Sequence, residues 1–329
     1  MTERKKINWL LILQGWTMLW VVLGHAPLGV AGEGPGWENS LYNLAYSFPM
    51  SLFILISGYL FQMTRLAPGS KWKYGDMLAD KALRLLVPMA VFTMVAFLLK
   101  VLLPSQMDRE ADLTLWGIVS AFLRPYNGPL REMWFIVTLF WMFILSPLWQ
   151  WSLGKPWRSA LLAALLLVLH YFHLDWEFLS LKRVFAYAFW FYCGILMSCR
   201  NIPEKVIAPR KFLFMVAGLV IYIAGLPLDG MICTAGAVIF SLALALALDS
   251  FLPRIFSSFR NYTYQIFLMG IFAQMGIKIL YRIFDIPYIP AYLLCVAAGI
   301  YVPVLISIAV KRTGFAPLMV SIGLKPAKK

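Results

Sequence analysis

Apolar runs recur along almost the whole chain and leave only short polar connections between them. A helix needs about 20 apolar residues to cross the hydrocarbon core of a bilayer, and most of these runs approach or exceed that length. The sequence therefore predicts an all-α, polytopic membrane bundle of about ten transmembrane helices. The expected spans lie near residues 9–30, 42–63, 84–104, 130–151, 158–173, 182–199, 211–227, 231–250, 261–283 and 288–310.

The composition excludes a soluble protein. Apolar residues make up 61% of the chain and charged residues only 13%, which is too little charge to cover a water-facing surface. No long polar insert interrupts the runs, so residues 1–329 are predicted to form a single integral-membrane domain. The first run has spanning length and lacks a small-residue cleavage site, so we expect it to stay in the mature protein.

The net charge of +14 would suggest a nucleic-acid partner in a soluble protein. In a membrane protein the distribution of Lys and Arg along the chain indicates which loops face the cytoplasm. With the N-terminus in the cytoplasm, 21 of the 29 Lys and Arg residues fall on the cytoplasmic side and eight on the outer side. This asymmetry predicts that both termini are cytoplasmic, with membrane lipid and no nucleic acid as a partner.

His25 is an unusual residue because it closes the first apolar run. An ionisable side chain inside a membrane helix is costly and by default marks function. With a rise of 1.5 Å per residue, His25 lies roughly 24 Å beyond Trp9, toward the far side of the bilayer. Gln14 precedes it by about three helical turns and so shares nearly the same face. Two alternatives are that His25 has reached the opposite headgroup region, or that it only hydrogen-bonds a neighbouring helix.

Small residues in the first two runs predict close helix packing. Gly15 and Gly24 let another helix approach the backbone of the first run, and Ser57-Gly58 permits a close crossing in the second.

A basic pair marks the predicted cytoplasmic entrance to the third run. Lys81 and Arg84 lie one helical turn apart and share a face, and Arg65 precedes them in the same connection. Such side chains often anchor a helix to lipid phosphates. Alternatively, they bind a soluble polyphosphate through charge-assisted hydrogen bonds.

At the outer edge, the fourth run opens with Arg131 and Glu132, and Trp134 follows them. The predicted topology places them at about the depth of His25. A carboxylate there would accept a hydrogen bond from the imidazole, fix its tautomer and stabilise the imidazolium. The alternative is an interfacial ion pair in which Glu132 is favoured by the positive end of the helix dipole.

No metal site is expected. The four cysteines lie within or at the ends of apolar runs without metal-ligand spacing. His170 and His173 stand beside Asp175 and Glu177, but a short turn in contact with water explains this pattern better than a metal site.

Five strings stand in order along the chain, namely Leu19–His25, Met50–Phe61, Lys81 and Arg84 with Pro88, Leu130–Phe135, and Asn261–Met269. Together they resemble the acyltransferase-3 family, whose members are ten-helix inner-membrane proteins that O-acylate cell-surface glycans.

The resemblance implies transfer of an acetyl or other short acyl group from cytoplasmic acetyl-CoA or another acyl-CoA to a hydroxyl. The acceptor would be a cell-envelope glycan or lipid-linked sugar at the bacterial inner membrane. His25 matches the essential histidine of the family, and Lys81 with Arg84 match its paired basic motif. The chain departs from the family pattern at Gln14, Pro49 and Gly270, where many members carry a basic residue, histidine and histidine, respectively.

The matched residues and the predicted topology together lead us to expect the following roles. His25 acts as general base or as an acyl relay, and Glu132 orients it. Lys81, Arg84, Arg65 and Gln14 bind the donor, whereas Arg131 and Trp134 face the acceptor sugar.

A transporter or flippase for lipid-linked saccharides is the rival function. It would predict inverted repeats, and no convincing internal repeat is found. A third alternative, a scaffold subunit, predicts that His25 tolerates substitution. The acceptor, the acyl chain length and the oligomeric state stay open.

Overall fold

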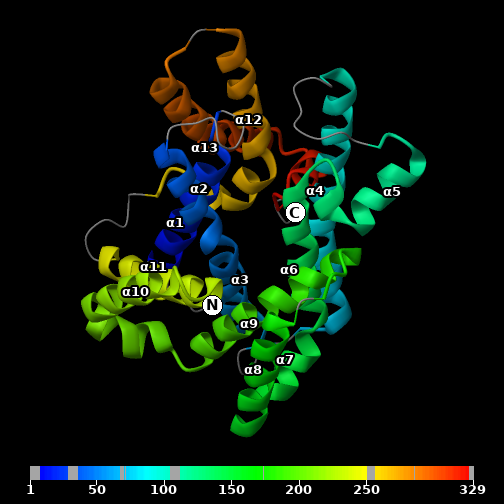
Figure 1. The fold of residues 1–329 in the computed structure, drawn as a ribbon. Coiled ribbons are helices and arrows are strands. Elements are labelled where there is room, and N and C mark those ends of the chain that lie inside the picture. Colours follow the sequence, from blue (N-terminus) through cyan, green and yellow to red (C-terminus); the bar gives the residue numbers. More distant parts are fainter. Residues whose placement is uncertain are drawn as a thin grey trace. The chain divides into compact units, whose positions relative to one another are not determined.

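The computed structural model describes residues 8–28, 36–66, 70, 72–103, 112–172, 174–249, 256–284 and 286–325. Every regular element within these ranges is a helix, and none is a strand (Figure 1). The prediction of an all-α fold is therefore confirmed for the described residues.

The chain separates into two compact units. Unit 1 comprises residues 1–56 and 197–307, and unit 2 comprises residues 57–196 and 308–329. The boundaries between the units fall inside helices α3, α9 and α13, so these three helices contribute to both.

The helices that begin or lie in unit 1 are α1 (Asn8–His25), α2 (Gly36–Ser47), α3 (Pro49–Phe61), α10 (Lys211–Gly225), α11 (Gly230–Leu248), α12 (Thr263–Ile283) and α13 (Tyr288–Thr313). Short turns also occur here, at Pro203–Ile207, Ala208–Arg210 and Arg260–Tyr262.

The helices that begin or lie in unit 2 are α4 (Tyr74–Leu102), α5 (Leu115–Leu123), α6 (Trp134–Ile144), α7 (Ser146–Leu153), α8 (Pro156–Tyr171), α9 (Leu181–Cys199) and α14 (Ala316–Ser321). Its short helical turns are Gln62–Leu66, Pro125–Asn127, Arg131–Met133 and Phe178–Ser180.

Within unit 1, α1 packs against α2, α11 and α12. Helices α10 and α11 lie side by side along their length (Figure 1). Gly236 permits this approach, because a Cβ added there would overlap the backbone of Tyr222. The outer face of α10 is apolar and more than half exposed at Phe212, Val216 and Val220, as expected for a helix surrounded by lipid.

Six helical segments among the described residues are long and apolar enough to cross a membrane, and they fit a multi-pass membrane protein. These segments are Gly36–Leu66, Tyr74–Leu102, Pro203–Gly225, Gly230–Leu248, Arg260–Ile283 and Tyr288–Thr313.

The predicted count of ten spans is not confirmed. The other four expected runs do form helices, but they are shorter, less apolar or bent. Helix α1 carries Asn8, Gln14 and His25, and α9 carries Lys182 and Arg183 in its first turn. Helix α8 has only 16 residues. The cytoplasmic placement of both termini stays a prediction.

The fourth expected run, residues 130–151, is bent. Helices α6 and α7 meet at 48°, and Pro147 stands in the first turn of α7. Proline has no backbone N–H to donate to the preceding turn, and its ring clashes with the carbonyl four residues earlier. The two helices together count as a seventh span if the bent pair crosses the membrane.

Candidate functional site

His25 is the last residue of α1 and is half-buried. Its Nδ1 lies 3.1 Å from the hydroxyl oxygen of Tyr46 on α2, and the two rings meet edge to face with centroids 5.7 Å apart. The contact with Tyr46 therefore orients the imidazole within unit 1.

Gly24 explains how Tyr46 reaches this histidine. A Cβ added at Gly24 would lie 3.0 Å from the Cβ of Ala45 and 3.1 Å from the ring of Tyr46. A larger residue would push α2 away from the end of α1. This close approach confirms that Gly24 permits tight packing.

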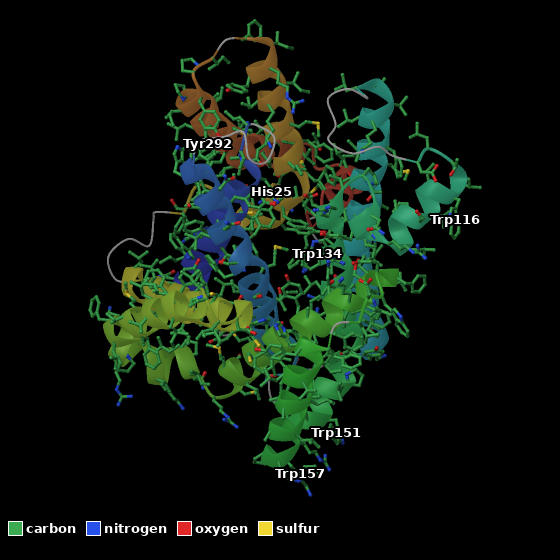
Figure 2. The ribbon with its side chains drawn as sticks, viewed as in Figure 1. His25, Trp116, Trp134, Trp151, Trp157 and Tyr292 are labelled. Carbon is green, nitrogen blue, oxygen red and sulfur yellow. The ribbon has the colours of Figure 1, made fainter. Side chains whose placement is uncertain are left out.

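Two distant side chains hold the last turn of α1. The carbonyls of a final helical turn lack partners within the helix. Here Gln274 Nε2 donates to the Val22 carbonyl at 2.9 Å, and the Tyr292 hydroxyl donates to the Leu23 carbonyl at 3.3 Å. Figure 2 labels Tyr292 and His25 in this unit. The turn that carries His25 is therefore fixed from α12 and α13.

Sequence reasoning did not identify Tyr46, Gln274 or Tyr292 as parts of this site. One available signal was Gln274, a buried amide in an apolar run. Unit 1 also contains the buried carboxylate Glu38, which accepts a hydrogen bond from the Tyr288 hydroxyl. Gln14 lies half-buried on α1, and its predicted contact with the donor stays a prediction.

In unit 2 the predicted basic residues do come together. The charges that act on Lys81 are those of Arg84, Arg65 and Lys325, with Asp80 as the opposing carboxylate. Arg65 pairs with Asp80 at 3.7 Å. The cluster therefore has four cations against one carboxylate, a balance that suits a ligand with several negative charges.

Lys81 has a partner within the protein, whereas one nitrogen of Arg84 has none among the described residues. The ammonium of Lys81 lies 3.9 Å from the centroid of the Phe143 ring on α6, where a cation–π interaction stabilises it. Arg84 Nε is buried and has no hydrogen-bond partner among the described residues. A buried donor without an acceptor is costly, so a ligand oxygen there would be bound favourably. Sequence reasoning missed Lys325 and Phe143.

Arg131 and Trp134 belong to a second cluster in unit 2. The guanidinium carbon of Arg131 lies 4.4 Å from the ring centroid of Tyr126, and that of Arg183 lies 3.6 Å from the same centroid. Trp134 stacks on Tyr187 with centroids 5.2 Å apart. Aromatic faces beside arginines suit the apolar faces and hydroxyls of a sugar.

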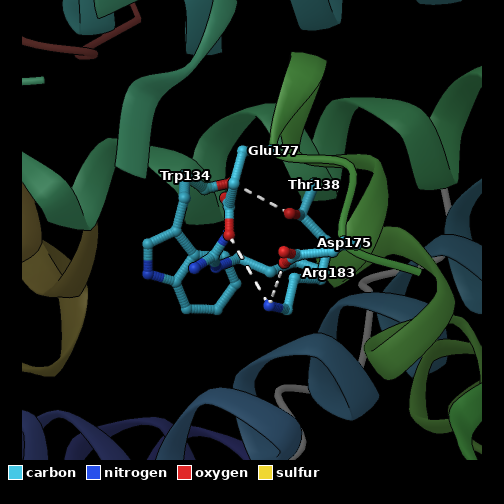
Figure 3. A network of polar contacts seen from close by, with 6 residues as sticks. Trp134, Thr138, Asp175, Glu177 and Arg183 are labelled. Carbon is cyan, nitrogen blue, oxygen red and sulfur yellow. Dashed lines mark hydrogen bonds and ion pairs between the residues drawn. The ribbon is translucent and has the colours of Figure 1, made fainter. Parts of the chain in front are cut away.

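Ion pairs surround this second cluster (Figure 3). Arg183 pairs with Glu177, and Lys182 Nζ lies 2.8 Å from Asp175 and 3.9 Å from Glu177. The Lys182 ammonium holds the pKa of the Asp175 carboxyl below its usual range. Arg183, Glu177, Tyr126 and Tyr187 were not predicted, because no motif marks them.

Glu132 is half-buried in the turn Arg131–Met133, which leads into α6. It belongs to unit 2, whereas His25 belongs to unit 1. The predicted pairing of these two residues therefore stays a prediction.

No three His, Cys, Asp or Glu side chains gather as metal ligands in the part of the chain that the structure describes. His170 Nδ1 lies instead 2.6 Å from the Ala186 carbonyl oxygen. His173 lies outside the described residues.

Comparison with known proteins adds one match. No curated protein and no solved structure was found to match the chain. The family model described as an acyltransferase domain matches residues 7–308 of the 329, which is nearly the whole chain. The chain therefore belongs to the acyltransferase-3 family.

Proposed function

We propose that this protein is a membrane O-acyltransferase of the bacterial inner membrane. It moves an acetyl or other short acyl group from cytoplasmic acyl-CoA to a hydroxyl of a cell-envelope glycan or a lipid-linked sugar. Membership of the family supports acyl transfer, and the six apolar helices support a location in a membrane.

The cation cluster around Lys81 is the observation that supports acyl-CoA as the donor. Acyl-CoA bears several phosphate charges, and the cluster holds an excess of cations in which Arg84 Nε has no partner among the described residues. In the predicted topology this cluster lies on the cytoplasmic side, where acyl-CoA is made.

In the proposed reaction His25 acts as general base. Its basic ring nitrogen takes the proton of the acceptor hydroxyl while the hydroxyl oxygen attacks the thioester carbonyl. The C–S bond then breaks, and the proton returns to the leaving sulfur to give free CoA. The products are the O-acyl glycan and CoA.

Tyr46 orients the imidazole for this step. The reaction uses the tautomer in which Nδ1 donates to the Tyr46 hydroxyl oxygen, so that Nε2 is the basic nitrogen. We propose that Glu132 supplies a negative charge that stabilises the imidazolium. An acyl-histidine relay uses the same geometry, since imidazole is also a competent nucleophile.

Purified full-length protein in lipid nanodiscs tests the proposed function. With labelled acetyl-CoA and a panel of O-antigen, exopolysaccharide and peptidoglycan-precursor glycans, we expect CoA release that matches label transferred to one acceptor. A transporter or flippase would move the lipid-linked sugar without releasing CoA. That result would contradict the proposal.

Arg84→Gln is expected to raise the KM for acetyl-CoA by about 10- to 100-fold, because a charge-assisted hydrogen bond to phosphate is lost. Initial rates over a range of acetyl-CoA concentrations measure this change. Arg158→Gln is a matched control, since Arg158 stacks on Trp151 and Trp157 outside the cluster. An equal rise in KM for both substitutions would show that the cation cluster does not bind the donor.

A further inference from the structure

An open pocket of about 620 Å³ lies at the start of α4 in unit 2. This volume falls in the range of small-molecule sites. Its wall includes Arg65, Trp72, Lys73, Asp76, Met77 and Asp80. Only Arg65 among these was assigned a ligand-binding role from the sequence.

The wall of the pocket combines three kinds of chemistry. Trp72 and Met77 offer an apolar surface, and the Trp72 ring is steadied by an edge contact with Phe61 at 6.4 Å between centroids. Asp76 and Asp80 offer acceptors for N–H and O–H donors. Arg65 and Lys73 offer positive charge. The two carboxylates would repel a simple anion, and a neutral sugar would not need the two cations. A nucleoside phosphate uses the apolar surface, the acceptors and the cations together.

The pocket continues toward the cation cluster. Asp76, Asp80 and Arg84 follow at intervals of four residues and therefore lie along one side of α4. Asp76 and Arg84 are about 12 Å apart along the helix axis. A ligand bound by both features would place an aromatic base at the pocket and its diphosphate near Lys81 and Arg84.

We propose that this pocket holds the adenosine half of the acyl-CoA donor. The adenine ring stacks on Trp72, and its amino group and the ribose hydroxyl donate to the carboxylates of Asp76 and Asp80. The diphosphate runs toward Arg84, and the pantetheine arm leaves beyond it. This inference rests on the proposed function, because it requires CoA as the donor.

Binding of adenosine 3′,5′-bisphosphate to the full-length protein tests the inference by calorimetry. Loss of base stacking in Trp72→Leu is expected to weaken binding about 10-fold and to raise the KM for acetyl-CoA similarly. Trp116→Leu is the matched control, because Trp116 lies exposed on α5 (Figure 2) and is not one of the residues that line the pocket. It is expected to bind the nucleotide like the wild type.

The hypoxanthine analogue of the bisphosphate tests the carboxylates separately. It lacks the amino group that donates to Asp76, so wild-type protein is expected to bind it about 5- to 10-fold more weakly. In Asp76→Asn this preference for adenine should disappear, whatever the stability of the variant.

Failure of the inference is distinguishable from failure of the proposed function. If Trp72→Leu and Asp76→Asn bind the nucleotide like the wild type while acetyl transfer proceeds, the adenosine lies elsewhere. If the wild type neither transfers acetyl groups nor binds the nucleotide, both proposals fall.

Discussion

His25→Gln is expected to lower kcat/KM for acetyl transfer by about 10²- to 10⁴-fold, the usual contribution of a general base. Glutamine keeps much of the size and polarity of the side chain but cannot take up a proton at neutral pH. Purified variant in nanodiscs, assayed for CoA release with the acceptor found for the wild type, measures this loss.

Two matched variants show whether the loss is chemical. His170→Gln changes a histidine of unit 2 whose ring contacts the Ala186 carbonyl, and it is expected to retain transfer. Tyr46→Phe removes only the hydroxyl beside His25 Nδ1. We expect it to lower kcat about 10-fold with an unchanged KM for acetyl-CoA, and to shift the pH profile of kcat.

Labelled acetyl-CoA without acceptor separates the two mechanisms. An acyl-histidine relay predicts label on His25 in the wild type, whereas direct attack predicts none. If His25→Gln transfers acetyl groups within threefold of the wild-type rate, His25 has no catalytic role. The scaffold alternative would then gain support.

Much of the fold follows from local pattern. The apolar runs predict helices because a backbone inside a bilayer has to satisfy its own hydrogen bonds. Most of the described residues in each of the ten expected runs are helical. Pro147 marks the bend between α6 and α7 in the sequence, because proline cannot donate a backbone hydrogen bond to the preceding turn. Proline alone does not locate a bend, however, since Pro88 and Pro303 stand inside the continuous helices α4 and α13. The number of spans was less readable, because polar residues such as Gln14 lower the apolar character of α1.

The surroundings of His25 were not predictable in the same way. Gln274 reaches Val22 across 252 residues of sequence, and Tyr292 reaches Leu23 across 269. No periodicity connects residues so far apart. Lys325 likewise acts on Lys81 from the far end of the chain. The sequence indicates which side chains are unusual, whereas only the fold shows which of them meet.

The cluster around Trp134 depends on two backbone conformations that are unfavourable for residues other than glycine. Leu179 and Ser180 both adopt positive φ, at 49° and 58°. Such angles are uncommon for residues other than glycine. The indole N–H of Trp141 donates to the Leu179 carbonyl at 3.1 Å and so holds this turn in place. The turn leads directly into α9 and thereby places Arg183 over Tyr126.

Gly58→Ala is expected to destabilise unit 2 strongly. A Cβ at Gly58 would overlap the carbonyl oxygen of Phe191, which belongs to the backbone of α9 and cannot rotate aside. Helices α3 and α9 would have to separate, at a cost of about 3 kcal/mol or more. We expect the thermal midpoint of the detergent-solubilised protein to fall by about 5–10 °C.

Gly276→Ala supplies the control for this measurement. Gly276 is also a helical glycine, on α12, but a Cβ there meets nothing within 4 Å. Because alanine favours helix over glycine, this variant is expected to unfold at the wild-type temperature or slightly above it. Equal midpoints for the two variants would show that α3 and α9 do not cross at Gly58. A selective loss in Gly58→Ala would show that close backbone packing holds these two helices together, which the sequence indicated through Ser57-Gly58.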